Sequence, residues 1–146
     1  MTKKKRNVIS LFSGCGGTDV GFHGGFKVQK KQITDKNLLK DPLDKKTWIE
    51  TKETSFQTVL ANDIRPRAKI AFDEYFNTAD KDVYFVESIV DLVKRSKSGE
   101  FIFPDADVVT GGFPCQDFSL SGKRCGFKSQ NTILEKKLTL MLMPPQ

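Results

Sequence analysis

A short apolar run that stops in a glycine-rich loop is the feature of this sequence that most constrains its fold. Residues 7–12 (Asn-Val-Ile-Ser-Leu-Phe) are mostly apolar, and residues 13–17 (Ser-Gly-Cys-Gly-Gly) place three glycines within four positions. The run predicts a strand, the glycines predict a tight turn or a close approach of the backbone to a ligand, and Thr18 is expected to cap a helix over residues 18–22. An ordinary strand-to-helix turn explains the same glycines.

The same alternation of apolar runs and helical periodicity continues along the chain. Strands are expected at residues 7–12, 58–63, 83–86 and 107–110, and helices at residues 18–22, 67–76 and 89–97. Pro66 suits the first turn of the second helix, whose Phe72, Tyr75 and Phe76 are expected in the core. Strands that alternate with helices predict an α/β fold with a parallel sheet.

Residues 27–57 interrupt this alternation. They are rich in Lys, Thr and Asp and contain the only tryptophan, Trp48, without a sustained period of either kind. Structureless stretches of this length are uncommon inside compact α/β units, so we interpret the segment as an inserted loop with one short helical turn. Its function is not evident from the residues.

Composition limits the classes of protein and of site. The net charge of +6 and the isoelectric point near 9.2 are compatible with a polyanionic partner without requiring one. Three cysteines without a Cys-x-x-Cys pair and a single histidine, His23, argue against a disulfide framework and a zinc site. No apolar stretch is long enough for a membrane span, and with a mean hydropathy of −0.40 we expect a cytoplasmic protein.

Two positions carry candidate chemistry. Cys115 follows the strand at residues 107–110 in a turn of sequence Gly-Gly-Phe-Pro-Cys, which suits a nucleophile. A lone cysteine in a loop is more often a buried apolar residue, and the turn fits that interpretation too. Asp63 ends the second strand, where a carboxylate either accepts hydrogen bonds from ribose hydroxyls or caps the following helix.

Three motifs, in this order, resemble the DNA cytosine-5 methyltransferases. They are Phe-Ser-Gly-Cys-Gly-Gly at residues 12–17, Asn-Asp-Ile-Arg-Pro-Arg-Ala at 62–68, and Gly-Phe-Pro-Cys-Gln-Asp-Phe-Ser-Leu-Ser-Gly-Lys-Arg at 112–124. The resemblance runs from about residue 8 to residue 127. It implies a Rossmann-like S-adenosylmethionine-dependent methyltransferase fold, of which this chain holds the first half of the sheet, about four strands, with an inserted loop.

The resemblance also implies roles for single residues. Cys115 corresponds to the nucleophile that attacks ring carbon 6 of a flipped-out cytosine in double-stranded DNA. The positions implied to bind S-adenosylmethionine are Phe12, Ser13, Gly14, Cys15, Gly16, Gly17, Asp63, Ile64, Ser88, Ile89 and Pro114. The positions implied to contact DNA are Gln116, Ser119, Lys123 and Arg124. The resemblance implies no metal, and it implies a prokaryotic or phage source.

The chain also departs from the family pattern. The acid that usually follows the third strand and faces the adenine amino group is replaced by Ser88, with Glu87 one position earlier. Residues 128–146 diverge, and no Glu-Asn-Val element supplies the acid for cytosine ring nitrogen 3. We therefore expect residues 1–146 to form a partial catalytic domain that is inactive alone. The chain is then a gene fragment, a remnant of a methyltransferase, or one half of a split restriction-modification methyltransferase that a second chain completes.

Two other classes of function stay open. The chain is alternatively a non-catalytic module that binds S-adenosylmethionine or DNA. A less favoured interpretation is an unrelated dinucleotide-binding domain, which explains the glycine loop and gives Cys115 no role.

Overall fold

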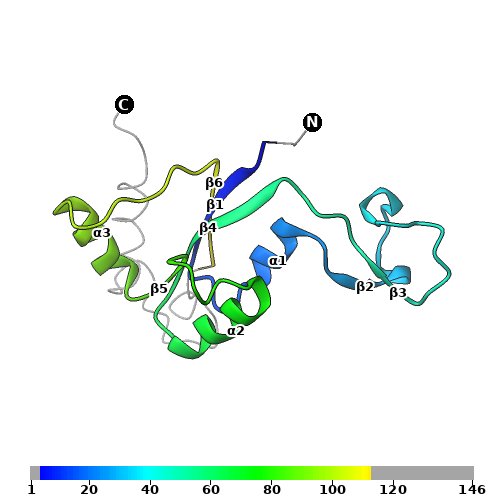
Figure 1. Ribbon diagram of the computed structural model, residues 1–146, viewed down its shortest axis with the longest axis horizontal. Coiled ribbons are helices and arrows are strands. Elements are labelled where there is room, and N and C mark those ends of the chain that lie inside the picture. The colour runs from blue at the N-terminus through cyan, green and yellow to red at the C-terminus, as the bar shows by residue number, and fades with distance from the viewer. Residues whose placement is uncertain (1–3, 113–146) are drawn as a thin grey trace, which may run out of the picture.

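A parallel sheet of four strands forms the centre of the molecule, with helices on both of its faces (Figure 1). The computed structural model describes residues 4–112. The strand order is β5-β4-β1-β6, with β1 (Arg6–Leu11), β4 (Phe56–Asp63), β5 (Tyr84–Val86) and β6 (Val108–Gly111). The helices between them are α1 (Gly17–His23), α2 (Pro66–Phe76) and α3 (Ile89–Lys97). The predicted α/β class with a parallel sheet is confirmed.

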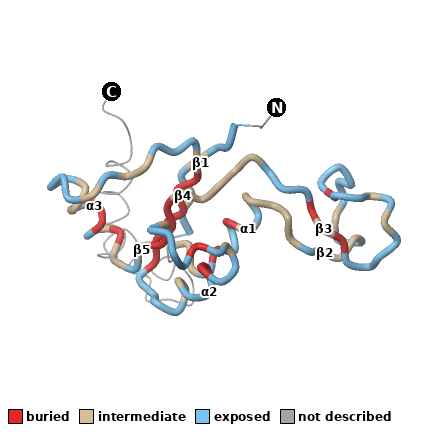
Figure 2. Tube along the Cα trace, viewed as in Figure 1, coloured by how far each residue is buried: buried red, intermediate tan, exposed pale blue. Residues whose placement is uncertain are grey.

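Alternating side chains of the central strands supply the cores on the two faces. Ile9 and Leu11 of β1 pack with Leu60 of β4 and with Leu92 of α3. On the other face Ala61 packs with a second cluster that contains residues of α2 and β5. Figure 2 shows the buried residues concentrated along β1, β4 and β5 and on the sheet-facing sides of α2 and α3. This two-sided burial fits the nearly continuous apolar runs of parallel strands.

Most predicted boundaries agree with the structure within a residue or two. Helix α3 spans the predicted residues, and Pro66 occupies the first turn of α2 as expected. The predicted cap at Thr18 is wrong, because α1 begins at Gly17 and its N-cap is Gly16, whose φ of 85° sets the start of the helix. Tyr75 is not in the core: the residue is 53% exposed and lines an open hollow beside Phe76.

The inserted segment differs from the predicted loop. It contains the antiparallel pair β2 (Lys27–Gln29) and β3 (Trp48–Glu50) and two short 3₁₀ turns, η1 (Lys30–Gln32) and η2 (Lys36–Leu38). Strands of three residues are too short to show a period in the sequence, and cross-strand contacts such as Val28 opposite Ile49 hold them together. We call residues 27–52 the arm, because they extend away from the sheet and its helices (Figure 1).

Within residues 4–112, no helix combines the length and apolar character needed to cross a membrane.

Candidate functional site

The carboxyl ends of the four parallel strands meet at one edge of the sheet, where ligands bind in open α/β folds. The register places Leu11 of β1 between Asn62 of β4 and Gly111 of β6. On the far side of β4, Asp63 pairs with Val86 of β5. The glycine loop, Asp63 and the end of β6 therefore occupy neighbouring positions along this edge.

The glycine loop leaves β1 through a series of left-handed backbone conformations. Phe12, Gly14 and Gly16 have φ angles of 54°, 54° and 85°. A Cβ atom at Gly16 would lie 2.7 Å from ring atoms of both Phe72 and Phe76 on α2. Gly16 is thus required twice, for its backbone conformation and for the close approach of the loop to α2.

Hydrogen bonds tie the glycine loop to β4 and β5. The backbone N–H of Ser13 donates to the carbonyl oxygen of Asn62 at 2.9 Å, and that of Gly14 donates to Oδ2 of Asp63 at 3.1 Å. The Tyr84 hydroxyl donates to the carbonyl oxygen of Gly14 at 2.8 Å. Burial raises the pKa of Tyr84 to about 12, so this hydroxyl keeps its proton and remains a donor. The loop is therefore held in shape before any ligand arrives.

Asp63 is the most heavily hydrogen-bonded side chain of this edge. Besides Gly14, it accepts from the backbone N–H of Arg65 at 3.0 Å and from the Arg65 guanidinium at 3.1 and 3.3 Å. A carboxylate offers about four acceptor positions, so all of them are used in this structure. A ribose hydroxyl that binds Asp63 has to replace a guanidinium N–H of Arg65, whose side chain is 71% exposed and has room to move.

The same contacts fix the charge of Asp63. Burial alone raises the pKa of this carboxyl, but hydrogen bonds from the Arg65 side chain and backbone, the charge of Arg65 and the Gly14 amide together lower it below its usual value. Asp63 is therefore a permanent acceptor at neutral pH, as a partner for hydroxyl groups must be.

The two isoleucines of the predicted site lie in different environments. Ile64, next to Asp63, is 69% exposed and leaves apolar surface free at the edge of the sheet. Ile89, the first residue of α3, is 7% exposed and packs in the core. An apolar ligand surface has a ready partner in Ile64, whereas Ile89 is largely used by the fold.

Ser88 and Glu87, which follow β5, already have partners. The Ser88 hydroxyl caps α3 by accepting from the backbone N–H of Val90 at 3.3 Å. The Glu87 carboxylate accepts from Nη1 of Arg95 at 2.7 Å. Both side chains therefore have structural tasks at the point where the family pattern leads us to expect an adenine-binding acid.

The predicted nucleophile segment lies outside the described residues, as do all of the predicted DNA contacts. This applies to Pro114, Cys115, Gln116, Ser119, Lys123 and Arg124. The structure does show where the segment begins. Strand β6 ends beside the glycine loop, and a Cβ atom on Gly111 would lie 3.8 Å from the Phe12 ring.

His23 belongs to a polar network on the α1 face of the sheet. The buried Asp19 accepts from the hydroxyls of Ser10 and Thr58 at 2.9 and 2.6 Å, and Nε2 of His23 accepts from the backbone N–H of Thr58 at 2.9 Å. Burial lowers the pKa of His23, against a smaller opposite effect of Asp19. A neutral imidazole that accepts from the backbone has a structural role in this network.

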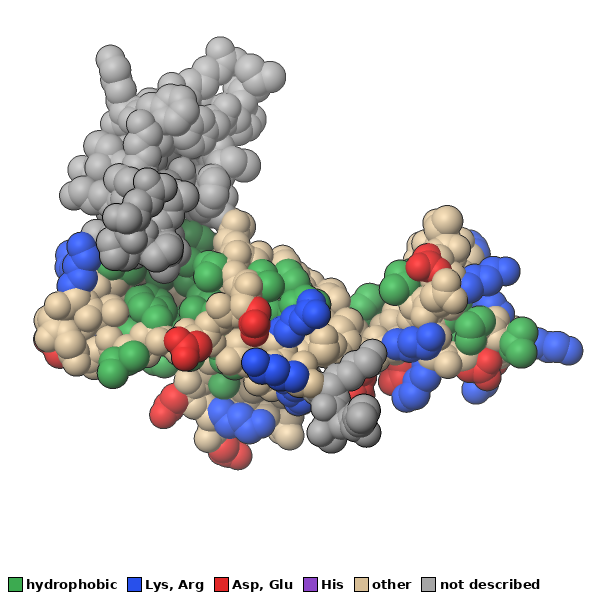
Figure 3. All heavy atoms as spheres, turned by 90° about the horizontal axis from the view of Figure 1, so that it is seen from above, with side chains coloured by type: hydrophobic (Ala, Val, Ile, Leu, Met, Phe, Trp, Pro, Cys, Tyr) green, Lys and Arg blue, Asp and Glu red, His purple; other side chains and the backbone are tan. Residues whose placement is uncertain are grey.

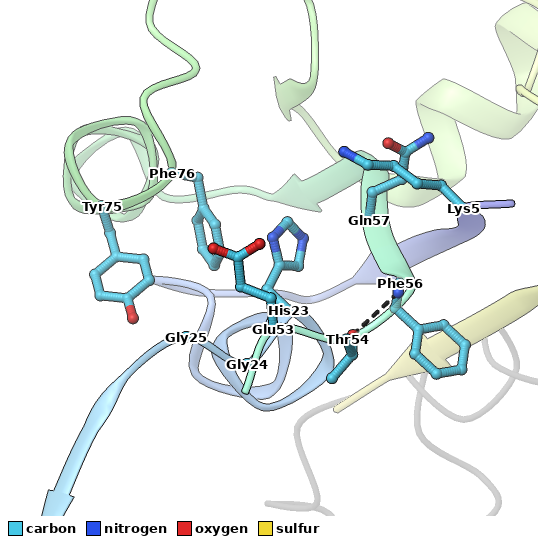
Figure 4. Close-up of a pocket in the computed structure, with 10 residues that line it drawn as sticks. All are labelled: Lys5, His23, Gly24, Gly25, Glu53, Thr54, Phe56, Gln57, Tyr75 and Phe76. Atoms are coloured by element: carbon cyan, nitrogen blue, oxygen red, sulfur yellow. Dashed lines mark hydrogen bonds between the residues drawn. The ribbon is translucent and has the colours of Figure 1, made fainter. Parts of the chain in front are cut away.

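A hollow of about 480 Å³ lies at the amino end of β4, away from the glycine loop (Figure 4). His23, Glu53, Tyr75 and Phe76 line part of it. Both polar and apolar residues line this open hollow, and none of the predicted site residues is among them. In the part of the chain that the structure describes, no group of three or more His, Cys, Asp or Glu side chains is placed to hold a metal ion.

Three residues of the site went unrecognised in the sequence. Arg65 pairs with Asp63, Tyr84 fixes the loop, and the Asn62 amide donates to the carbonyl oxygens of Phe85 and Glu87 at 3.0 and 2.9 Å. The position of Arg65, two residues after the acid that ends the strand, could have indicated that it pairs with Asp63. Nothing in the local sequence of Tyr84 indicates a partner 70 residues earlier.

The fold is a parallel α/β domain with a candidate ligand site at the carboxyl edge of its sheet. The family model for the C-5 cytosine-specific DNA methylases matches residues 6–140, so the chain belongs to this family. It is 36% identical over 82% of its length to the type II methyltransferase M.BspRI of Lysinibacillus sphaericus, and 30% identical over 92% to M.NgoFVII of Neisseria gonorrhoeae. The chain spans about a quarter of each of these relatives, 26% in both cases.

Proposed function

We propose that this chain supplies the cofactor site and the nucleophile for transfer of a methyl group from S-adenosylmethionine to carbon 5 of cytosine in DNA. The observation that carries the proposal is the carboxyl edge, where the glycine loop, the ionised Asp63 and the end of β6 lie together. The relatives named type II methyltransferases support a restriction-modification setting.

The residues of this edge fit the chemistry of S-adenosylmethionine. Asp63 accepts from the ribose hydroxyls after displacing Arg65, and the exposed Ile64 offers an apolar contact for the adenine ring. The loop at residues 13–17 lies against the methionine moiety, and Phe12 and Pro114 lie beside the cofactor. When bound, the cofactor supplies an electrophilic methyl group on a positively charged sulfur.

Cys115 makes the cytosine ring reactive. Its thiolate adds to ring carbon 6, and the electron pair of the carbon 5–carbon 6 double bond becomes available at carbon 5. Carbon 5 forms the new bond to the methyl group as the methyl–sulfur bond breaks, and the electron pair of that bond stays on sulfur in the departing thioether. Loss of the carbon 5 proton to a base then restores the double bond and expels the thiolate. A free thiol has a pKa of about 8.5, so the site has to increase the thiolate fraction or deprotonate the thiol as it attacks.

Double-stranded DNA with an extruded cytosine is the substrate in this proposal. Gln116, Ser119, Lys123 and Arg124 contact the DNA. No Glu-Asn-Val element occurs in the 146 residues, so in this proposal residues outside them supply the acid for cytosine ring nitrogen 3. We therefore expect the 146 residues alone to bind the cofactor without turnover.

Calorimetry tests the cofactor site. The wild-type chain is expected to bind S-adenosylmethionine, and Asp63→Ala to bind about 10-fold to 100-fold more weakly, since hydrogen bonds to a charged group contribute about 1.5–3 kcal/mol. Asp80→Ala, at an exposed position after α2, is the matched control. Equal affinity of the wild type and Asp63→Ala would contradict the assigned ribose contact.

Transfer of a tritiated methyl group to DNA tests the chemistry. The chain is assayed alone and with a second polypeptide that carries the part of the M.BspRI relative beyond the matched region. We expect incorporation only in the mixture, and its loss in Cys115→Ser but not in the control Cys125→Ser. Turnover by the chain alone would show that the missing acid is dispensable, and turnover by Cys115→Ser would refute the covalent mechanism.

A further inference from the structure

The arm carries most of the excess positive charge of the chain. Residues 27–52 contain eight lysines and four carboxylates, a formal charge of +4 out of +6 for the whole sequence. Figure 3 shows their side chains on a lobe set apart from the sheet and its helices. We propose that the arm binds the phosphate backbone of duplex DNA as a second contact surface. The proposal rests on the proposed function in naming DNA as the polyanion.

Most of these lysines are available to a partner. Lys40 pairs with Glu50 at 3.0 Å and Lys46 with Asp44 at 3.5 Å, and Nζ of Lys30 donates to the carbonyl oxygen of Asp44. Five exposed lysines have no carboxylate within ion-pair distance among the described residues: Lys27, Lys31, Lys36, Lys45 and Lys52. Phosphate groups would be their first ionic partners.

The type of cation indicates what the arm recognises. The arm has no arginine, although the rest of the chain contains several. Arginine forms paired hydrogen bonds with base edges, whereas lysine acts as a mobile point charge that suits phosphates. The arm is therefore suited to hold a duplex without reading its sequence.

The lysines belong to a segment with ordered secondary structure and buried residues of its own. Leu39 and Ile49 are buried within the arm, outside the two clusters of the sheet. Backbone hydrogen bonds from Lys40 to Glu50 and from Lys52 to Leu38, at 2.9 and 2.8 Å, connect the strands to the 3₁₀ turns. A charged surface on a folded segment loses less conformational entropy on binding than a charged disordered segment does.

The arm also contains its own reporter. Trp48 is the only tryptophan of the chain, lies in β3 and is 56% exposed. Its fluorescence therefore reports on the arm alone. DNA that binds along the arm should change this signal, whereas DNA held only at the carboxyl edge of the sheet should not.

Salt-dependent DNA binding by the full chain tests the proposal. Affinity for a duplex of about 30 base pairs is measured without cofactor, by Trp48 fluorescence and by anisotropy of labelled DNA, between about 50 and 200 mM salt. The arm variant is Lys31→Gln/Lys36→Gln/Lys45→Gln. The control, with the same change in net charge, is Lys81→Gln/Lys94→Gln/Lys97→Gln, at exposed positions outside the arm.

We expect the arm variant to reduce the slope of log affinity against log salt by about 2 to 3, and the control to change it by less than about 1. Equal slopes for the two variants, or no change in Trp48 fluorescence on binding, would overturn the proposal. Self-association of the chain that depends on concentration and is abolished by Leu43→Ser would also overturn the proposal. Leu43 is 88% exposed, and such a result would mean that the arm is a protein-docking surface. Absence of methyl transfer in the mixture with the second polypeptide, together with the expected reduction of the slope in the arm variant, would count against the proposed function alone.

Discussion

Asp63 shows how one residue joins fold and candidate chemistry. Its carboxylate is 6% exposed, yet it remains charged because Gly14 and Arg65 donate to both oxygens. The same contacts connect β4 to the glycine loop of β1. A substitution at Asp63 is therefore expected to affect stability as well as cofactor binding. The pH dependence of stability shows how much of the effect comes from the charge of the Asp63 carboxylate.

We expect Asp63→Asn to be less stable than the wild type at neutral pH by about 1–2 kcal/mol, because the amide forms weaker bonds with Arg65. The folded-state pKa of Asp63 lies below its usual value of 3.8, so its stabilisation is complete above that value and is lost as pH falls through the folded pKa. Urea unfolding from pH 7 down to pH 3 measures the difference, with Asp80→Asn as control. A difference that grows towards low pH would contradict the assignment.

The glycine loop shows at the scale of one element how packing selects residues. Gly16 and Gly17 are adjacent at the start of α1, but only Gly16 combines a positive φ with a crowded position. A Cβ atom added to Gly17 would have no heavy atom within 4 Å apart from its chain neighbours and the nearby backbone of α1, so this position is open. The pair therefore offers a matched test of loop-to-helix packing.

We expect Gly16→Ala to destabilise the protein by about 1–3 kcal/mol, because the new methyl group meets Phe72 and Phe76 in a strained backbone conformation. Gly17→Ala should be neutral or stabilising by up to about 1 kcal/mol, since alanine favours the helix. Chemical denaturation of the two variants provides the comparison. Equal effects would mean that the loop is not held against α2.

Ser88 tests whether a capping residue also recognises the cofactor. Ser88→Ala should lose about 1 kcal/mol of stability with the cap. Ser88→Asp keeps a capping oxygen and restores the acid that the family usually has here, so we expect tighter binding of S-adenosylmethionine and unchanged stability. Calorimetry and thermal unfolding measure both. Unchanged affinity in Ser88→Asp would show that this position does not face the adenine amino group.

At the scale of the whole molecule, the arm and the sheet are separate packing units. The arm has buried side chains of its own, Leu39 and Ile49, and neither belongs to the two clusters at the sheet. Its two ends are adjacent, since the backbone N–H of Thr51 donates to the carbonyl oxygen of Phe26 at 2.9 Å. A tight turn is therefore expected to join Phe26 to Thr51 without disturbing the sheet.

Replacement of residues 27–50 by Asn-Gly, a sequence that favours two-residue hairpin turns, should leave a folded protein. We expect cofactor affinity to stay within about twofold of the wild type. The salt dependence of DNA binding should fall as in the arm variant. Circular dichroism, calorimetry and DNA titration test these three expectations. Loss of cooperative unfolding would show that the arm is part of the same folding unit as the sheet.

The residues of α3 show why much of the fold was predictable. Ser88 caps the helix, apolar residues recur on one face, and basic residues with Gly99 follow at the end, so every local signal agrees. In β2 and β3 the signals are absent, because three residues form no recognisable period. Tyr75 had the right helical spacing for the core, but spacing cannot tell how far the neighbouring sheet extends over a helix.

The sequence by itself determined the alternation of strands and helices, the glycine loop, the strand-end acid and the family motifs, because each depends on neighbouring residues. Only the tertiary structure decided that Asp63 is shared between Gly14 and Arg65, that Tyr84 holds the loop, and that the inserted residues form an arm. These features depend on contacts between residues far apart in the chain. The contacts of Gly14 with Asp63 and Tyr84 exist only when the parallel strands lie side by side, and the arm exists only when β2 and β3 pair.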